Sequence, residues 1–155
     1  MNALTKALVI AGMLALNGAV ALAAEGTGGA GRVRVDTESK KGFKQTVEAV
    51  EKAVKNRGMM VVAKIDHQNM LTMVGVKIGG SMTIEFGKPD MGKMVLTMAP
   101  EAGLEMPGKI YVFEKEGKIL ISYYKSNFVN YSPDFTNVDE MMGMMVAEIV
   151  KEAAQ

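Results

Sequence analysis

Hydrophobic residues follow two different spacings along this chain, and the order of the two spacings constrains the fold most strongly. Alternating, strand-like segments fall at residues 32–36, 59–66, 81–86, 109–114 and 118–124. Helical spacing covers residues 43–57 and the segment after residue 136, and a shorter helix opens at residue 89. This order predicts an α+β two-layer sandwich. Two main helices lie on one face of a mainly antiparallel or mixed sheet, in the order β-α-β(4)-α with a short helical insert.

Local signals support this order. Gly58 follows the first helix and can supply its left-handed cap. Glu116-Gly117 lies between the last two strand-like runs and predicts a β-hairpin turn. Residues 76–78 offer a further short strand, and residues 124–135 are expected to form a loop.

Apolar stripes identify the residues expected to face the core. In the short helix the stripe is Met91, Met94, Val95 and Met98. In the last helix the inward residues are expected to be Val138, Met141, Met142, Met145, Ile149 and Ala153. Methionine at these positions is read mainly as an adaptable core filler.

The N-terminal segment has the features of a secretory signal. Lys6 precedes an uncharged run from Ala7 to Ala24, and Ala21-Leu22-Ala23 has the small-residue pattern of a cleavage site. The alternative is a membrane anchor, because this run has 18 residues, close to the minimum for crossing a bilayer. We expect residues 1–23 to be a cleaved signal peptide, residues 24–31 a Gly-rich linker, and residues 32–155 a single domain.

Composition excludes several classes of function. The chain has no cysteine, which removes disulfides, thiolate metal sites and thiol nucleophiles. Beyond residue 23 it has 17 basic and 17 acidic residues, so no excess of positive charge favours nucleic acid. We expect a bacterial periplasmic or secreted protein with no membrane contact after cleavage.

Methionine and histidine suggest an alternative function. Thirteen of the 15 methionines follow residue 23, and His67, Met70 and Met73 lie close together in the sequence. Imidazole and thioether groups are suitable ligands for Cu(I), and haem also accepts them. The alternative prediction is therefore a periplasmic copper or haem binder that uses these three residues. The leading prediction has no cofactor.

The candidate ligand-binding residues are aromatic or polar. Asp66 and His67 end a predicted strand, and Tyr123 and Tyr124 end the hairpin, so a ligand pocket is expected beside these residues. Met141 and Met144 lie in a methionine cluster on the last helix that predicts an interface, since all its members cannot point inward. No catalytic residues are assigned, because the one histidine has no nucleophile motif near it. Whether the protein is an enzyme is left open, and the sequence favours a non-catalytic role.

From Val33 to Glu152 the chain resembles the domain-of-unknown-function 302 family. The matching strings are Ile65-Asp66-His67 after the Gly58 helix end, Phe86-Gly87-Lys88-Pro89 and Leu104-Glu105-Met106-Pro107, in this order. The resemblance implies a β-α-β(4)-α domain that often self-associates and has no agreed activity. Taken together, we expect a non-catalytic domain that binds a partner or small ligand and forms a homodimer, with a periplasmic protein as a further partner.

Overall fold

The computed structural model describes residues 24–27 and 31–155. The predicted signal peptide, residues 1–23, lies outside the described residues. Six antiparallel strands form one sheet in the order β1-β2-β6-β5-β4-β3. In chain order the strands are β1 (Ala24–Thr27), β2 (Val33–Ser39), β3 (Met60–Asp66), β4 (Ser81–Gly87), β5 (Gly108–Lys115) and β6 (Lys118–Tyr124).

Within the part of the chain that the structure describes, α-helices and short 3₁₀ helices connect or follow these strands. They are α1 (Phe43–Asn56), α2 (His67–Thr72), α3 (Pro89–Met98), η2 (Pro100–Glu105), η3 (Phe128–Asn130), η4 (Pro133–Phe135) and α4 (Thr136–Ala154). Among the described residues, no helix is both long enough and apolar enough to cross a lipid bilayer.

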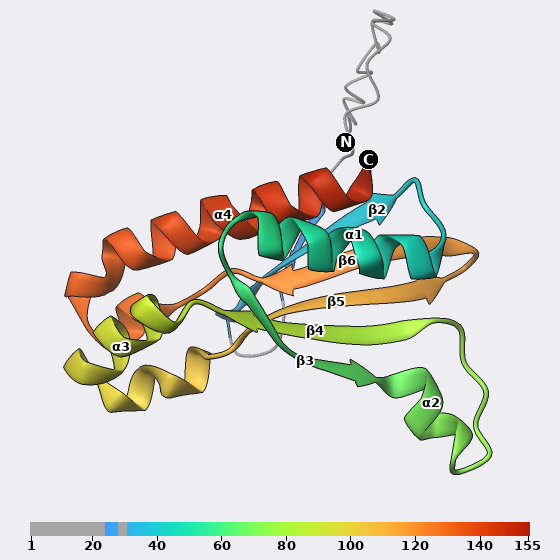
Figure 1. The fold of residues 1–155 in the computed structure, drawn as a ribbon, viewed down its shortest axis with the longest axis horizontal. Coiled ribbons are helices and arrows are strands. Elements are labelled where there is room, and N and C mark those ends of the chain that lie inside the picture. Colours follow the sequence, from blue (N-terminus) through green and yellow to red (C-terminus); the bar gives the residue numbers. More distant parts are fainter. Residues whose placement is uncertain (1–23, 28–30) are drawn as a thin grey trace, which may run out of the picture.

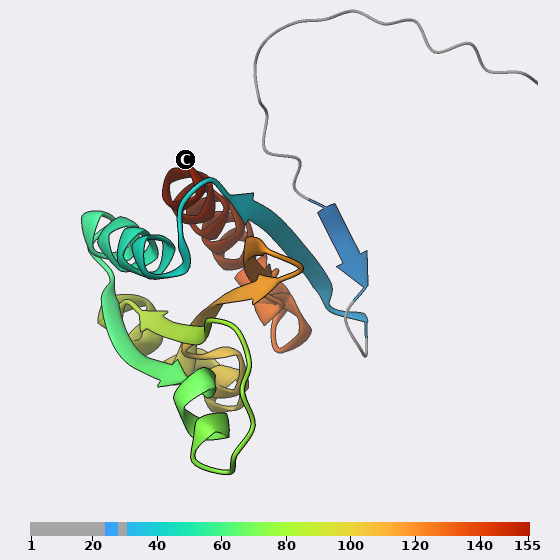
Figure 2. The ribbon, with the colours of Figure 1, turned by 90° about the vertical axis from the view of Figure 1, so that its right-hand side faces the viewer.

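Helices α1 and α4 lie beside each other on one face of the sheet (Figures 1 and 2). Val50 and Val54 of α1 and Ile149 of α4 are fully buried against the sheet residues Ile84 and Ile110. The side chains that alternate with these on the strands lie on the opposite face, which neither helix covers. The predicted α+β two-layer fold is therefore confirmed.

The local turn predictions are also confirmed. Glu116 and Gly117 have positive φ angles of 53° and 76°, and Lys115 pairs with Lys118 across the two-residue turn. Positive φ at both central residues gives the turn a twist that matches the flanking strands. Gly58 has a φ of 67°, which fits its predicted position after the first helix.

Two segments differ from the sequence predictions. Within the expected linker at residues 24–31, Ala24–Thr27 forms β1 and pairs with β2 from Ala24↔Asp36 to Thr27↔Val33, while residues 28–30 lie outside the described part. Residues 76–78 form no strand, because α2 precedes them and the chain then turns at Gly75, whose φ is 81°. The amide of Val76 donates to Leu71 O at 3.0 Å, which closes the end of α2.

Several methionines expected in the core are exposed. In α3 only Val95 is buried, whereas Met94 and Met98 are 43% and 55% exposed. In α4, Met141 is 41% exposed, because the buried stripe passes through Met142, Val146, Ile149, Val150 and Ala153 instead. Helical spacing correctly predicts an apolar face, but the position of that face depends on what the helix packs against.

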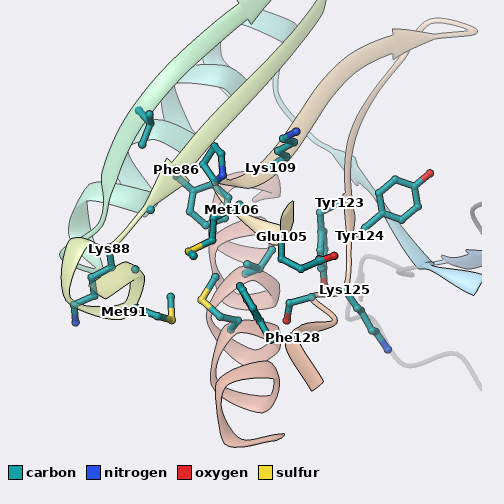
Figure 3. A pocket seen from close by; sticks show the side chains of 18 of the residues that line it. Phe86, Lys88, Met91, Glu105, Met106, Lys109, Tyr123, Tyr124, Lys125 and Phe128 are labelled. Carbon is teal, nitrogen blue, oxygen red and sulfur yellow. The ribbon is translucent and has the colours of Figure 1, made fainter. Parts of the chain in front are cut away.

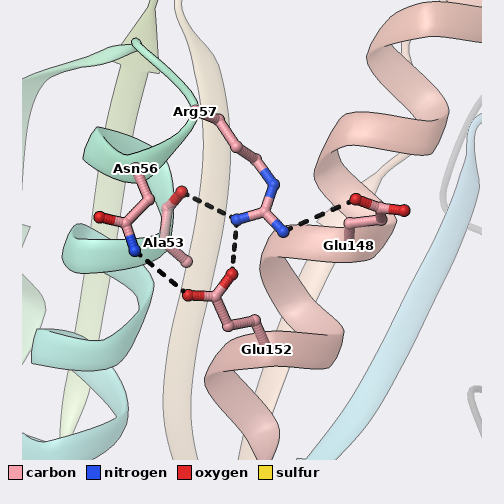
Figure 4. A network of polar contacts seen from close by, with 5 residues as sticks. All are labelled: Ala53, Asn56, Arg57, Glu148 and Glu152. Atoms are coloured by element: carbon pink, nitrogen blue, oxygen red, sulfur yellow. Dashed lines mark hydrogen bonds and ion pairs between the residues drawn. The ribbon is translucent and has the colours of Figure 1, made fainter.

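A polar network joins the C-terminal ends of α1 and α4 (Figure 4). Arg57 donates to Glu152 Oε2 at 2.7 Å and to the carbonyl of Ala53 at 3.0 Å. Its other terminal nitrogen lies 3.7 Å from Glu148 Oε2, and Asn56 donates to Glu152 Oε1 at 3.4 Å. The hydrogen bond from Arg57 holds the pKa of the Glu152 carboxyl below its ordinary value of 4.5.

We predict a pH-dependent stability difference between the wild type and Glu152→Gln. Because the carboxyl pKa is lower in the folded state, its stabilising contribution is complete above the unfolded-state pKa and is lost as the pH falls through the folded-state pKa. Urea unfolding should show a more stable wild type at neutral pH and equal stabilities in acid below the lowered pKa. A difference that is the same at both pH values would contradict this role.

We also predict that Gly80→Ala destabilises the domain. A Cβ at Gly80 would overlap the Phe43 ring, at 2.5 Å from its Cδ2. The Gly80 carbonyl accepts from Glu114 N at 2.8 Å, which keeps the backbone from moving away. Overpacking of this kind typically costs about 1–3 kcal/mol in the free energy of unfolding.

Gly143→Ala is the matched control for Gly80→Ala. The Cβ position at Gly143 has open space, and the residue lies inside α4. Alanine there should stabilise the protein by about 0.5–1 kcal/mol, because it restricts the unfolded chain more than glycine does. Both values come from urea denaturation, and an unchanged stability of Gly80→Ala would mean that Phe43 moves aside freely.

Candidate functional site

A cavity of about 990 Å³ lies at the end of the sheet where β4 and β6 end and β5 begins (Figure 3). Its walls come from these strand ends, from α3 and η2, and from the middle of α4. The volume is within the range of sites that bind cofactors and other small molecules.

The pairing of the strands explains why space opens here. The ladder between β5 and β6 runs from Lys115↔Lys118 and ends at Tyr111↔Ser122. The neighbouring ladders continue further, to Phe86↔Gly108 between β4 and β5 and to Arg34↔Tyr124 between β2 and β6. Strands β5 and β6 therefore separate at this end while each stays paired on its other side.

Gly108 permits the close packing at the base of the cavity. A Cβ at this position would lie 2.8 Å from Cζ of Phe86, which is 1% exposed. Glycine thus lets the Phe86 ring pack directly against the first residue of β5. The Phe86 ring then forms part of the cavity lining.

Most of the cavity surface is apolar. The buried lining side chains on the helix-covered side are Phe86, Tyr123, Phe128, Met142 and Val146. Further apolar lining comes from α3, η2 and the uncovered face of the sheet: Met60, Val62, Met91, Leu96, Leu104, Met106, Tyr111 and Phe113. A ligand with a substantial apolar part would lose contact with water here, which favours binding.

Two ion pairs lie on the β2 side of this apolar surface. Arg32 Nη2 donates to Glu105 Oε2 at 2.7 Å, and the Arg32 guanidinium carbon lies 5.3 Å from the centre of the Tyr124 ring. Arg34 pairs with Asp36 at 2.6 Å, and the Asp36 carboxylate also accepts from Ser122. Figure 3 shows Glu105 between Met106 and the two tyrosines.

Two buried polar atoms of the cavity lining have no hydrogen-bond partner. They are Nε of Arg32 and Oγ of Ser126. Buried polar groups in native proteins are nearly always paired, so atoms of this kind require an explanation. Both residues lie where β2 begins and β6 has just ended.

The predicted ligand-binding residues fall in two neighbouring places. Tyr123 and Tyr124 both line the cavity, with Tyr123 buried and Tyr124 exposed. Asp66 and His67 are not lining residues. His67 Nε2 is instead hydrogen-bonded to Oγ1 of the lining residue Thr83 at 2.8 Å, with its ring edge-on to Tyr111 at 5.8 Å.

Asp66 and His67 have separate local roles. The Asp66 carboxylate accepts from Asn69 N at 2.8 Å and so caps the start of α2. The hydrogen bond and the ring contact attach His67, the first residue of α2, to β4 and β5. These contacts connect the projecting helix to the sheet (Figure 1).

The alternative metal site at His67, Met70 and Met73 stays a prediction. All three residues lie on or directly after α2, and Met70 and Met73 are exposed. Within residues 24–27 and 31–155, no group of three or more His, Cys, Asp and Glu side chains could hold a metal ion. A methionine site of the predicted kind would depend mainly on thioether groups.

Sequence reasoning did not select Arg32, Glu105 and Ser126 as site residues. Arg32 belongs to the alternating run at 32–36, where polar residues are expected on any strand with one solvent-exposed face. Ser126 lies in a segment without periodicity, and Glu105 is more than 70 residues from Arg32 in the chain. The pairing of β2 with β6 and the position of η2 between β4 and β5 bring these three residues to one end of the sheet.

Comparison with known proteins identifies the family. The crystal structure of an uncharacterized conserved protein DUF302 from Bacillus stearothermophilus is similar to this structure, with a TM-score of 0.72 and 17% sequence identity over 79% of this chain and 98% of that chain. No curated protein matches the chain significantly. Residues 35–153 match the family described as domain of unknown function DUF302. The chain therefore belongs to the DUF302 family.

Proposed function

We propose that this domain is an exported, non-catalytic binding protein that holds a small molecule with an apolar body in the cavity at the end of the sheet. The observation that carries the proposal is the cavity itself, with its volume of about 990 Å³ and its largely apolar lining. Export is proposed from the signal-like segment at residues 1–23.

The chemistry of the lining favours binding over catalysis. The acidic side chain in the described lining, Glu105, is paired with Arg32, and His67 is outside the lining. Histidine and carboxylate groups, which serve most often as general acids or bases, therefore either lie outside the described lining or are held in an ion pair. Aromatic and methionine side chains provide apolar contact that adapts to a ligand.

Filling the cavity should weaken binding without unfolding the protein. Gly143 lines the cavity between Met142 and Val146, and the space at its Cβ position is open. We predict that Gly143→Leu lowers the affinity for the neutral fluorophore Nile red by about tenfold or more, because the new side chain occupies ligand space. Fluorescence titration of the chain from Ala24 onward measures this affinity.

Gly143→Ala is the matched control for this experiment. Alanine also removes the helix-interior glycine but adds only one carbon, so Nile red affinity should stay near that of the wild type. Thermal unfolding of both variants checks that the fold is retained. Saturable binding that is equal in the wild type and Gly143→Leu would place the probe elsewhere, and no binding to the wild type would contradict the proposed function.

Self-association is the second part of the proposal. Met144 and Met141 on α4 are 67% and 41% exposed, so both can contact a second copy of the chain. We predict that the wild type forms a dimer and that Met144→Lys shifts it toward monomer, because a lysine ammonium is costly to bury in an apolar contact. Sedimentation velocity measures the shift. Glu140→Lys on the same helix is the control for added charge, and an equal effect of both variants would argue against a specific role of Met144.

A further inference from the structure

We infer that the ligand of this cavity carries a carboxylate, which is bound by the guanidinium of Arg32 and the hydroxyl of Ser126. This inference rests on the proposed function, because it names the chemical class of the molecule that the cavity holds. The ligand is therefore an amphipathic acid whose apolar body lies among the aromatic and methionine side chains.

The unpaired polar atoms carry the argument. Arg32 Nε and Ser126 Oγ are both buried without a partner, and both residues line the cavity. The N–H of arginine is a donor only, and a serine hydroxyl donates as well as accepts. Both groups are satisfied together by a ligand group with two acceptor oxygens, and a carboxylate has this form.

The strand register brings the two residues close together. Arg34 pairs with Tyr124, and Lys125 N donates to Val33 O at 2.9 Å, which continues the pairing by one residue. The next pair in this register is Arg32 with Ser126. One small group at this end of the sheet can therefore reach both side chains.

Arg32 is held in position before a ligand binds. Its Nη2 donates to Glu105, and its guanidinium lies over the Tyr124 ring. These contacts use one terminal nitrogen and one face of the planar group, and the Arg32 side chain is still 41% exposed, so part of the guanidinium is open to a further acceptor. A preorganised guanidinium loses little freedom when a ligand binds.

The charge around the cavity favours an anion. Among its described lining residues, five are basic and Glu105 alone is acidic, the basic ones being Arg32, Arg34, Lys88, Lys109 and Lys125. Asp36 and Glu85 lie nearby and pair with Arg34 and Lys109. Counting these two carboxylates, the basic residues of this set outnumber the acidic ones by five to three. An apolar cavity wall strengthens this attraction relative to water.

Three probes of equal chain length test the inference: dodecanoate, 1-dodecanol and dodecylammonium, each below its micelle concentration. Displacement of Nile red from the chain from Ala24 onward measures their affinities. We expect dodecanoate to bind about tenfold or more tightly than 1-dodecanol, and dodecylammonium to bind most weakly. Equal binding of dodecanoate and 1-dodecanol would overturn the carboxylate inference and leave the proposed function intact.

Variants of the lining locate the carboxylate through the ratio of the affinities for dodecanoate and 1-dodecanol. Ser126→Ala should reduce this ratio several-fold, and the double variant Arg32→Gln, Glu105→Gln should remove it. Both partners of the ion pair are changed together because Arg32→Gln alone would leave Glu105, whose side chain is only 10% exposed, as an unpaired charge. Glu105→Gln alone should raise the ratio, because it removes a carboxylate that competes for Arg32.

The affinity ratio should fall in Ser126→Ala and in the double variant but rise in Glu105→Gln, so general damage to the fold cannot explain both changes. A destabilised protein would bind both probes more weakly and would leave their ratio unchanged. Lys44→Gln, at an exposed position on α1, is the control for loss of a positive charge away from the cavity. A ratio unaffected in Ser126→Ala and in the double variant would overturn the inference. Failure of Nile red itself to bind would instead overturn the proposed function.

Discussion

The separation of β5 from β6 is the constraint on which the candidate site depends. At the other end of these strands a two-residue turn, Glu116-Gly117, keeps them paired. At the cavity end β5 pairs only with β4 and β6 pairs only with β2, since the ladder between them stops at Tyr111↔Ser122. The separation of the two strands opens the cavity. Helices α3 and η2, which connect β4 to β5, form one of its walls.

Most of the fold could be predicted from the sequence, because each core element has its own periodic signal. The hairpin turn, the Gly58 helix end and the two long helices are local features, and local physics determines them. Residues 67–72 were harder, because a six-residue helix has too few positions to show a period. The sequence feature that indicates this helix is Asp66, because its side chain caps the start of the helix.

The candidate site was harder to predict from the sequence than the fold, for a physical reason. Tyr123 and Tyr124 could be selected as aromatic residues at a strand end, but the cavity also needs residues from α3, η2 and α4. Met94 and Met98 illustrate the same limit, because an apolar stripe shows which side of a helix avoids water without showing whether a partner covers it. Register is a property of strand pairs, and the pairing of β2 with β6 places Arg32 and Ser126 at the same end of the sheet.

The two adjacent tyrosines also explain how one cavity reaches both faces of the sheet. Neighbouring strand residues point to opposite faces, so Tyr123 lies on the side of α4 and Tyr124 on the uncovered side. In a continuous sheet such residues would line different surfaces. Because β5 has separated from β6 at this point, both tyrosines border the same space. A ligand there would contact the buried methionine and phenylalanine side chains on one side and the Arg32 and Tyr124 pair on the other.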